Sequence, residues 1–316
     1  MSFSMNIKNE ISKHLTNNSC CQLAELSALI KMTGTIQIHG NKGFGIKLHT
    51  ENASIARRIF SLIKDNFNEN IQVSMIKNKQ LNKNNSYILQ ISKDMGSEQI
   101  LKECGILIEN EKGIKFNYGV PHGLIKKSCC KKAYLKGAFL GGGSVSDPEK
   151  NYHLEIVANS SEYAEGIKNL INHFGLSAKV VVRKNSFIVY LKEGEQIVDF
   201  LNIIGAHQAL LSLENIRIFK EMRNNVNRIV NCETANLSKT VNAAVRQIES
   251  IEYIRDKIGL NKLPDGLQQI AEVRLNYQDA SLKELGEMLS PVIGKSGVNH
   301  RLRKLEQIAE SLRGKQ

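Results

Sequence analysis

Polar and basic side chains gather on one face of a predicted helix near the C-terminus of this 316-residue chain. The helix is expected to begin at Ser296, as its N-cap, and to end near Leu312, with one apolar stripe: Val298, Leu302, Leu305 and Ala309. The opposite face carries Ser296, Asn299, His300 and Arg303, flanked by Lys295 and Lys304. Asn can pair with adenine and Arg with guanine through two hydrogen bonds each, whereas Lys neutralises phosphate. This face therefore predicts recognition of double-stranded DNA.

Two preceding helices are predicted to position that face. The first covers residues 266–277, and a capping box of Ser281 and Glu284 opens the second. A break at 290–294 separates the second helix from the last one. This is the order of a helix-turn-helix module, so Ser281 and Lys283 join the predicted DNA contacts. A plain three-helix bundle with a solvated face remains an alternative.

A basic helical segment lies before this module. Residues 215–230 contain one acid, Glu221, against four bases: Arg217, Lys220, Arg223 and Arg228. The polar stretch 231–240 follows, and residues 242–258 are again amphipathic. Arg223, Arg228 and Lys239 are predicted to contact DNA phosphates. The alternative for 231–240 is a solvated connector.

The six cysteines are two adjacent pairs and two isolated residues: Cys20-Cys21, Cys129-Cys130, Cys104 and Cys232. Zinc sites usually space two thiolates as C-x-x-C so that both reach one ion. Adjacent residues on a helix point about 100° apart, so the cysteines are interpreted as small buried residues in a reducing compartment. No metal and no cofactor is predicted, and metal binding by the cysteines is the alternative. The glycine-rich run at 141–144 lacks the spacing of a phosphate-binding loop and is interpreted as tight packing and a turn before a strand.

Both cysteine pairs belong to a stretch that occurs twice. Residues 19–34 and 128–143 match without a gap at six positions, always 109 residues apart. Small residues recur there at spacing four: Ala24 and Ala28 in the first copy, and Ala133, Gly137 and Gly141 in the second. Residues four apart share a helix face, and Gly inside a helix costs about 1 kcal/mol, so it needs a packing reason. The pattern predicts two closely packed helices that join two pseudo-symmetric halves; two unrelated core helices are the alternative.

These paired stretches resemble the LAGLIDADG motifs of homing endonucleases, with residues 26–34 and 135–143 on the nine motif positions. In active members, an acid just before the last Gly holds a catalytic metal. Thr33 and Gly142 stand at those positions here, and neither supplies the carboxylate oxygen that magnesium requires. The nearest acids are Glu25, two turns back in its helix, and Asp147, beyond the motif. The resemblance implies a retained fold without catalytic residues.

Each half repeats one order of elements. The first is predicted as strands 35–39 and 44–49, helix 53–67, strands 72–76 and 87–92, and a helix over 97–107 capped by Ser97. The second is predicted as the repeated helix, strand 154–158, helix 160–174, strands 178–182 and 187–191, and helix 195–204. Two antiparallel sheets should therefore flank the helix pair. The resemblance implies that they form the saddle on which LAGLIDADG proteins bind duplex DNA.

Charge and composition agree with a nucleic-acid partner. Forty-three basic and 31 acidic residues give a net charge of +12, which favours a polyanion. No apolar run approaches the ~18–20 residues of a membrane span, and residues 1–18 lack the apolar core of a signal peptide. A cytoplasmic protein without a membrane partner is predicted.

The degenerate motifs, the pattern N-R-x-x-N-C-x-x-A-N-x-x-K-T over 227–240 and the helix-turn-helix together resemble the WhiA family over essentially the full chain. The resemblance implies a nucleoid-associated, sequence-specific DNA-binding regulator of bacterial cell division and sporulation, without enzymatic activity. Its C-terminal module would be similar to region 4 of sigma factors, with the transcription machinery as a candidate partner. Actinobacterial members act with a WhiB-type iron–sulfur protein. The Lys, Asn and Ile bias here indicates an AT-rich genome instead, so that partner is not carried over.

The predicted fold class is α+β, in three parts. A duplicated LAGLIDADG-like α-β-β-α-β-β-α domain covers 1–207, with halves near 1–107 and 121–207. A basic helical connector covers 208–262, and an all-α helix-turn-helix domain covers 263–316, with its motif near 280–313. Two functions are kept as alternatives. One is a catalytically active endonuclease that cuts DNA at a specific site, and the other is a protein-interaction scaffold with incidental basic charge.

Overall fold

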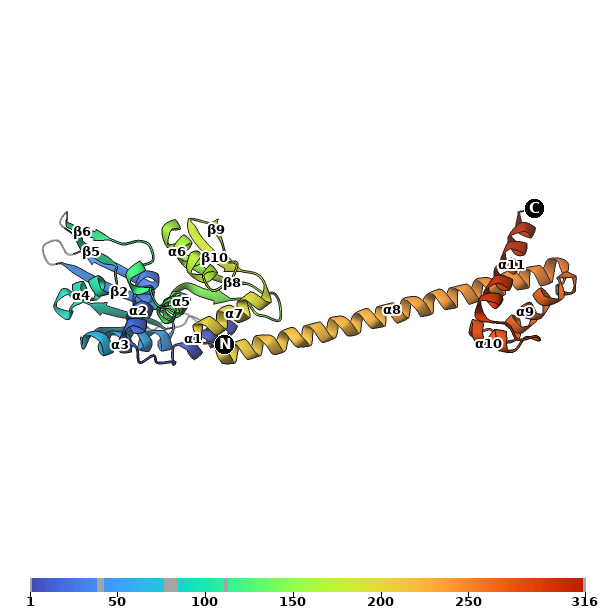
Figure 1. Cartoon of the computed structure of the whole chain (residues 1–316), viewed down its shortest axis with the longest axis horizontal. Coiled ribbons are helices and arrows are strands. Elements are labelled where there is room, and N and C mark those ends of the chain that lie inside the picture. Colours follow the sequence, from blue (N-terminus) through green and yellow to red (C-terminus); the bar gives the residue numbers. More distant parts are fainter. Residues whose placement is uncertain (1, 39–42, 77–84, 111–112, 315–316) are drawn as a thin grey trace. The chain divides into compact units, whose positions relative to one another are not determined.

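Helices and strands alternate through the first two-thirds of the chain, and the remainder is helical (Figure 1). The computed structural model describes residues 2–38, 43–76, 85–110 and 113–314. The chain divides into two units, Met1–Lys220 and Glu221–Gln316. Among the described residues, no helix combines the length and apolar character needed to cross a bilayer.

The first unit contains the predicted duplication. Its first half comprises α2 (Ser19–Thr33), β1 (Gly34–Ile38), β2 (Phe44–Thr50), α3 (Ala53–Phe67), β3 (Gln72–Ile76), β4 (Ser86–Ile91) and α4 (Ser97–Glu103). Its second half comprises α5 (Ser128–Gly142), β7 (Gly143–Val145), β8 (Leu154–Ala158), α6 (Ser161–Asn172), β9 (Lys179–Arg183), β10 (Ser186–Leu191) and α7 (Gly194–Ile204). The order α-β-β-α-β-β-α is confirmed in both halves. Outside this order lie α1 (Phe3–Ile11), the short helices η2 (Lys93–Met95) and η3 (His122–Leu124), and the hairpin of β5 (Leu107–Asn110) and β6 (Gly113–Phe116).

Each half forms one antiparallel four-stranded sheet, in the orders β1-β2-β4-β3 and β7-β8-β10-β9. Ile36 pairs with Ile46 in the first sheet, and Val189 pairs with Ile156 in the second. Directly paired residues lie on the same sheet face, so these rows form the core side of each sheet. Residues 39–42 and 77–84, which include the end of the predicted strand 35–39 and most of the chain between the paired strands, lie outside the described residues.

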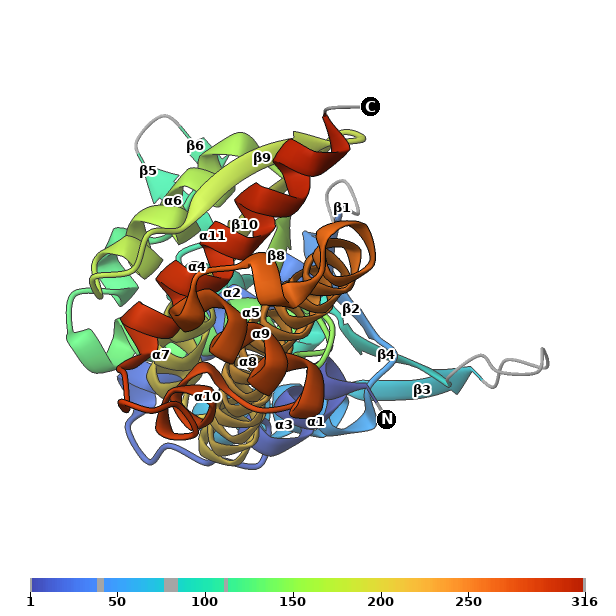
Figure 2. The same cartoon turned by 90° about the vertical axis from the view of Figure 1, so that its right-hand side faces the viewer.

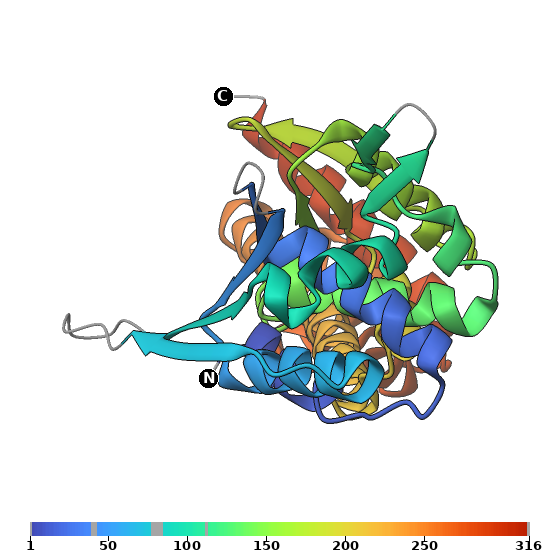
Figure 3. The ribbon, with the colours of Figure 1, turned by 90° about the vertical axis from the view of Figure 1, so that its left-hand side faces the viewer.

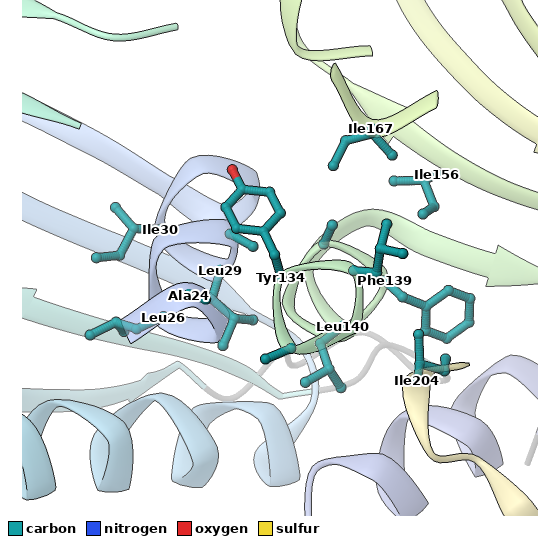
Figure 4. Packing of buried hydrophobic residues seen from close by; sticks show 14 of the residues in the cluster. Ala24, Leu26, Leu29, Ile30, Tyr134, Phe139, Leu140, Ile156, Ile167 and Ile204 are labelled. Carbon is teal, nitrogen blue, oxygen red and sulfur yellow. The ribbon is translucent and has the colours of Figure 1, made fainter. Parts of the chain in front are cut away.

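The two repeated helices form the centre of the unit, between the two halves (Figure 3). At Gly137 an added Cβ would lie 2.9 Å from Ala28 Cβ, and it would also collide with the Glu25 carbonyl oxygen. At Gly141 it would collide with Met32 Cβ. These glycines therefore have the packing role that their spacing predicts. Tyr134, Phe139 and other buried apolar residues of both helices pack in one hydrophobic core with the surrounding elements (Figure 4).

Two local predictions in this unit are wrong. The helix predicted over 97–107 ends at Glu103, and Leu107 begins β5. Gly96, in the left-handed region at φ +72°, is the N-cap of α4. The Ser97 side chain is buried and donates its hydrogen bond to the Phe44 carbonyl oxygen, so Ser97 joins α4 to β2 instead of capping α4.

A single helix, α8 (His207–Ile258), runs through the predicted basic helix, the polar stretch 231–240 and the next amphipathic segment. The polar stretch 231–240, for which a solvated connector was the alternative, is therefore an exposed part of one helix. Asn, Thr and Ser are neutral to mildly unfavourable in helices, but Thr240 Oγ1 donates to the Asn236 carbonyl oxygen at 3.0 Å and stays within the helical pattern. Low propensity in a few residues does not end a helix that has good helix formers on both sides.

Candidate nucleic-acid interface

The second unit builds a three-helix module on the end of α8. A short turn, η4 (Leu260–Lys262), leads into α9 (Asp265–Asn276), α10 (Leu282–Glu287) and α11 (Lys295–Arg313). All four residues of the stripe predicted for the last helix are buried in one cluster with residues of α9 and α10. Ile251 and Ile254 of α8 complete that cluster, so the folded module begins before residue 263. Figure 2 shows α11 beside α9 and α10.

The connection between α10 and α11 fixes the orientation of α11. Glu284 N donates to Ser281 Oγ at 3.4 Å and Ser281 N donates to Glu284 Oε2 at 2.7 Å, which confirms the predicted capping box. At Gly286 an added Cβ would lie 3.2 Å from Val298 Cγ2 and would collide with the Ile293 carbonyl oxygen. Glycine at this position therefore lets α10 approach the first turn of α11 closely.

The face of α11 opposite the buried stripe is free for a ligand. Five of the six predicted side chains are exposed, and Asn299 is half-buried: Lys295, Ser296, Asn299, His300, Arg303 and Lys304. Within the part of the chain that the structure describes, none of these six side chains has a hydrogen-bond or ion-pair partner. The intervening Arg301 differs, because its Nη1 donates to the Gly266 carbonyl oxygen at 3.2 Å and joins α11 to α9.

The predicted cap of this helix is wrong. Gly294 is the N-cap and Ser296 is the second residue of α11, because the chain turns into the helix two residues earlier than expected. Gly294 has no side chain to accept the first backbone N–H groups. An uncapped helix N-terminus favours anions such as phosphate, since free N–H donors and the helix dipole both point outward there.

The remaining predicted contacts lie on α8 and α10. Arg223, Arg228 and Lys239 are all exposed on α8. Lys283 is exposed on α10 and lies 3.8 Å from the Glu287 carboxylate. The Ser281 hydroxyl is engaged in the capping box. Contact of these five side chains with DNA stays a prediction.

The C-terminal ends of α2 and α5, where the resemblance to LAGLIDADG motifs placed the missing acids, have no carboxylate at residues 33 and 142. Thr33 Oγ1 donates to the Leu29 carbonyl oxygen at 2.8 Å, so the hydroxyl is used within its own helix. At Gly142 an added Cβ would lie 2.9 Å from the Val157 carbonyl oxygen. An acid at residue 142 would thus need the backbone of β8 to move.

The acids nearest to these positions have structural roles. Glu25 is fully buried, and Arg58 Nε and Nη2 donate to its two carboxylate oxygens at 2.8 and 2.6 Å. Lys136 Nζ lies 3.3 Å from the same carboxylate, and burial lowers the pKa of Lys136 while the Glu25 charge raises it. A buried carboxylate needs such partners to offset its desolvation. Asp147 Oδ1 accepts from Glu149 N at 3.0 Å in a local turn.

The cysteine arrangement differs from the prediction. Cys21, Cys104 and Cys130 are buried as expected, but Cys20, Cys129 and Cys232 are exposed. The four sulfur atoms of the two pairs, Cys20-Cys21 and Cys129-Cys130, all lie within 4.8 Å of one another. The spacing argument considered one helix at a time and missed this grouping. The ungapped register of the duplication was the available signal, because it places both pairs at the same end of two packed helices.

Family models match three stretches of the chain. They are the WhiA N-terminal LAGLIDADG-like domain at residues 19–107, the WhiA LAGLIDADG-like domain at 131–223 and the WhiA C-terminal HTH domain at 226–309. The last two models meet near the boundary between the two structural units.

Curated relatives match over the full length. A probable cell division protein WhiA from Alkaliphilus metalliredigens is 58% identical over 315 residues, covering 100% of this chain and 99% of that protein. A probable cell division protein WhiA from Clostridium botulinum is 56% identical over 313 residues, covering 99% of each. The crystal structure of full-length DUF199/WhiA from Thermotoga maritima is 25% identical, covers 98% of this chain and 99% of that chain, and superposes with a TM-score of 0.59. On its sequence, domain order and fold, the chain belongs to the WhiA family.

Proposed function

We propose that this chain is a sequence-specific DNA-binding regulator of bacterial cell division, and that its LAGLIDADG-like unit does not cut DNA. The outer face of α11 carries the proposal. It presents Asn299 and Arg303, which suit base edges, between Lys295 and Lys304, which suit phosphates. The close packing of α10 on the first turn of α11 at Gly286 supports insertion of α11 into a major groove.

The charge distribution supports a contribution of the first unit to affinity. Residues 1–220 contain 28 basic and 19 acidic residues, whereas residues 221–316 contain 15 and 12. Residues 221–316, which contain α9–α11, are therefore close to charge balance, and most of the positive excess lies in residues 1–220. A fragment of residues 221–314, which keeps Ile251, Ile254 and the basic residues of α8 after Lys220, should bind DNA more weakly than the full chain. Its salt dependence should also be shallower, because each phosphate neutralised adds about −0.9 to the slope on duplex DNA.

Binding measured against salt concentration tests this division. A steeper slope for the full chain supports it, and equal affinities and slopes for chain and fragment would rule out a contribution from the first unit. Loss of binding by both would reject DNA recognition and favour a protein-interaction scaffold.

The absence of cleavage follows from Thr33 and Gly142, which cannot hold the metal ions that in-line phosphoryl chemistry requires. The test incubates the full chain in excess with plasmid and chromosomal DNA and with magnesium or manganese. No cutting is expected. Cutting that is lost when acids near residues 33 and 142 are replaced would overturn the proposal and restore the endonuclease alternative.

We extend the proposal to transcription at the nucleoid and to sporulation, as the family resemblance implies. Contact with the transcription machinery would fit a module similar to region 4 of sigma factors. A genome-wide map of bound DNA, compared with transcript levels after deletion, tests both extensions. Binding sites without any change in nearby transcripts would exclude a regulatory role.

A further inference from the structure

We propose that Cys20, Cys21, Cys129 and Cys130 form a zinc site that joins the N-terminal ends of α2 and α5. Their four sulfur atoms all lie within 4.8 Å of one another, and the Cys129 and Cys130 sulfurs are 4.0 Å apart. In a tetrahedral zinc–thiolate site with Zn–S bonds of about 2.3 Å, simple geometry places the sulfurs roughly 3.8 Å apart. The observed spacing therefore requires only a small contraction around one ion.

The adjacency of the cysteines does not prevent this. Neighbouring Cα–Cβ bonds diverge on a helix, but the four sulfur atoms still converge within 4.8 Å of one another, so the two pairs can complete one tetrahedron. Each helix alone supplies two ligands, and the close approach at Gly137 and Gly141 brings the two helices together. The duplication thus provides a four-thiolate set from two copies of a two-residue motif.

The two helix N-termini beside the cluster favour negative charge, which opposes the effect of burial in raising the pKa of Cys21 and Cys130. All four cysteines lie in the first turn of a helix of 15 residues, where the dipole and free N–H groups stabilise negative charge. Among the described residues, neither N-cap, Asn18 or Lys127, makes a side-chain capping bond, and neither first turn contains an acid. Lys131 and Lys132 follow directly in sequence. On binding, four thiols release four protons and one Zn²⁺ enters, leaving a site of net charge −2 that these groups offset.

Zinc is the metal that this geometry fits best. Four sulfur ligands around one point in a tetrahedron are typical of a single zinc or iron ion, whereas a multi-iron cluster needs its thiolates farther apart. Cys21 and Cys130 are buried and Cys20 and Cys129 are exposed, so the site has a dry inner side and an open route for the ion. Four protein ligands leave no open coordination position, which makes the site structural.

The first test uses the unmodified full chain without a histidine tag. Zinc content after purification in the absence of chelators should be about one ion per chain, as for other closed four-thiolate sites. Adding Co²⁺ to the reduced, metal-free chain should give the intense visible absorption of tetrahedral cobalt and its sulfur-to-metal charge-transfer band. A chain that retains no zinc after reconstitution and gives no such bands would overturn the proposal. So would an intact-mass measurement showing that these cysteines form disulfides in the chain purified under reducing conditions.

The second test assigns the ligands. The C20S/C129S chain changes only the two exposed sulfurs and should lose most of its zinc, and C20S/C21S/C129S/C130S should lose all of it. Cys232→Ser, which changes an exposed thiol on α8, is the matched control and should keep wild-type zinc. Zinc that stays in C20S/C129S and is lost in Cys232→Ser would place the ion elsewhere. The cobalt spectrum of the unmodified chain decides the matter even where the fourfold variant does not fold.

Discussion

The central helix pair of the first unit and α11 of the second both carry polar side chains at helical spacing, but these side chains find partners in one case and not in the other. In α2 and α5, Glu25 pairs with Arg58 and Lys136, and Thr33 bonds within its own helix. On the outer face of α11, Arg303 and Lys304 are exposed and have no partner among the described residues. Polar groups already paired inside the protein maintain the fold. Those left unpaired at a fixed position are available to a ligand.

This difference indicates which polar residues of each unit the fold itself requires. A LAGLIDADG-like domain can keep its packing without catalytic acids. The close contact of α2 and α5 at Gly137 and Gly141 and the buried ion pairs of Glu25 do not depend on those acids. The helix-turn-helix face has no such internal partners. Its composition is what the proposed contact with DNA requires.

The largest effect is expected from Glu25→Gln. The change leaves Arg58 and Lys136 buried without a countercharge, which costs about 3–5 kcal/mol for a broken buried pair. Chemical denaturation should show this loss in the transition of the first unit, with the second unit unaffected. Glu165→Gln, which removes an exposed partner of Lys168, is the control and should change stability by less than about 1 kcal/mol. Equal, small effects would show that the Glu25 network is dispensable.

Leu302→Ala is expected to act on the other unit. Leu302 is fully buried in the three-helix core, so its truncation should cost about 2–5 kcal/mol and abolish DNA binding by unfolding α9–α11. Leu237→Ala, at an exposed position of α8, is the matched control. Circular dichroism with a DNA-binding assay measures both consequences. A folded Leu302→Ala module with normal binding would contradict the assigned core face.

Regular packing is what the sequence predicted best. The structure confirms three features that follow from periodicity. They are the duplicated order of helices and strands, the close helix contact at Gly137 and Gly141, and the buried stripe of α11. The errors fall where a tertiary contact replaces a local rule. Ser97 bonds to Phe44 in β2 instead of capping its own helix.

The candidate sites divide in the same way. The face of α11 could be predicted because one helix carries all of it, and one periodicity separates its buried and exposed sides. The four-cysteine cluster could not be predicted from spacing along either helix. Its members are 109 residues apart in two copies, and only packing of the copies brings Cys21 and Cys129 together.

A smaller effect is expected on the pH dependence of the first unit's stability, through Lys31 of α2. Burial lowers the pKa of Lys31 to about 8 from an ordinary 10.5, against an opposing effect of Glu162. Between these values the unfolded chain holds a proton that the folded chain has released, so stability of the first unit should rise with pH. The contribution should be below about 1 kcal/mol per pH unit, because the side chain is not fully buried. Denaturation at pH 7.5–9.5 measures it; Lys31→Met should reduce the rise, and exposed Lys150→Met should not.

Selection of preferred DNA sites by the full chain, Arg303→Ala and Lys304→Ala tests the central claim most directly. One bidentate base contact gives about 1–3 kcal/mol of discrimination, so Arg303→Ala should lose preference at one base pair and keep the rest of the site. Lys304→Ala should weaken all sequences alike, and exposed Lys262→Ala, outside α11, should match the wild type. If Arg303→Ala retains every wild-type base preference and loses only affinity, α11 binds phosphates and the reading surface lies elsewhere.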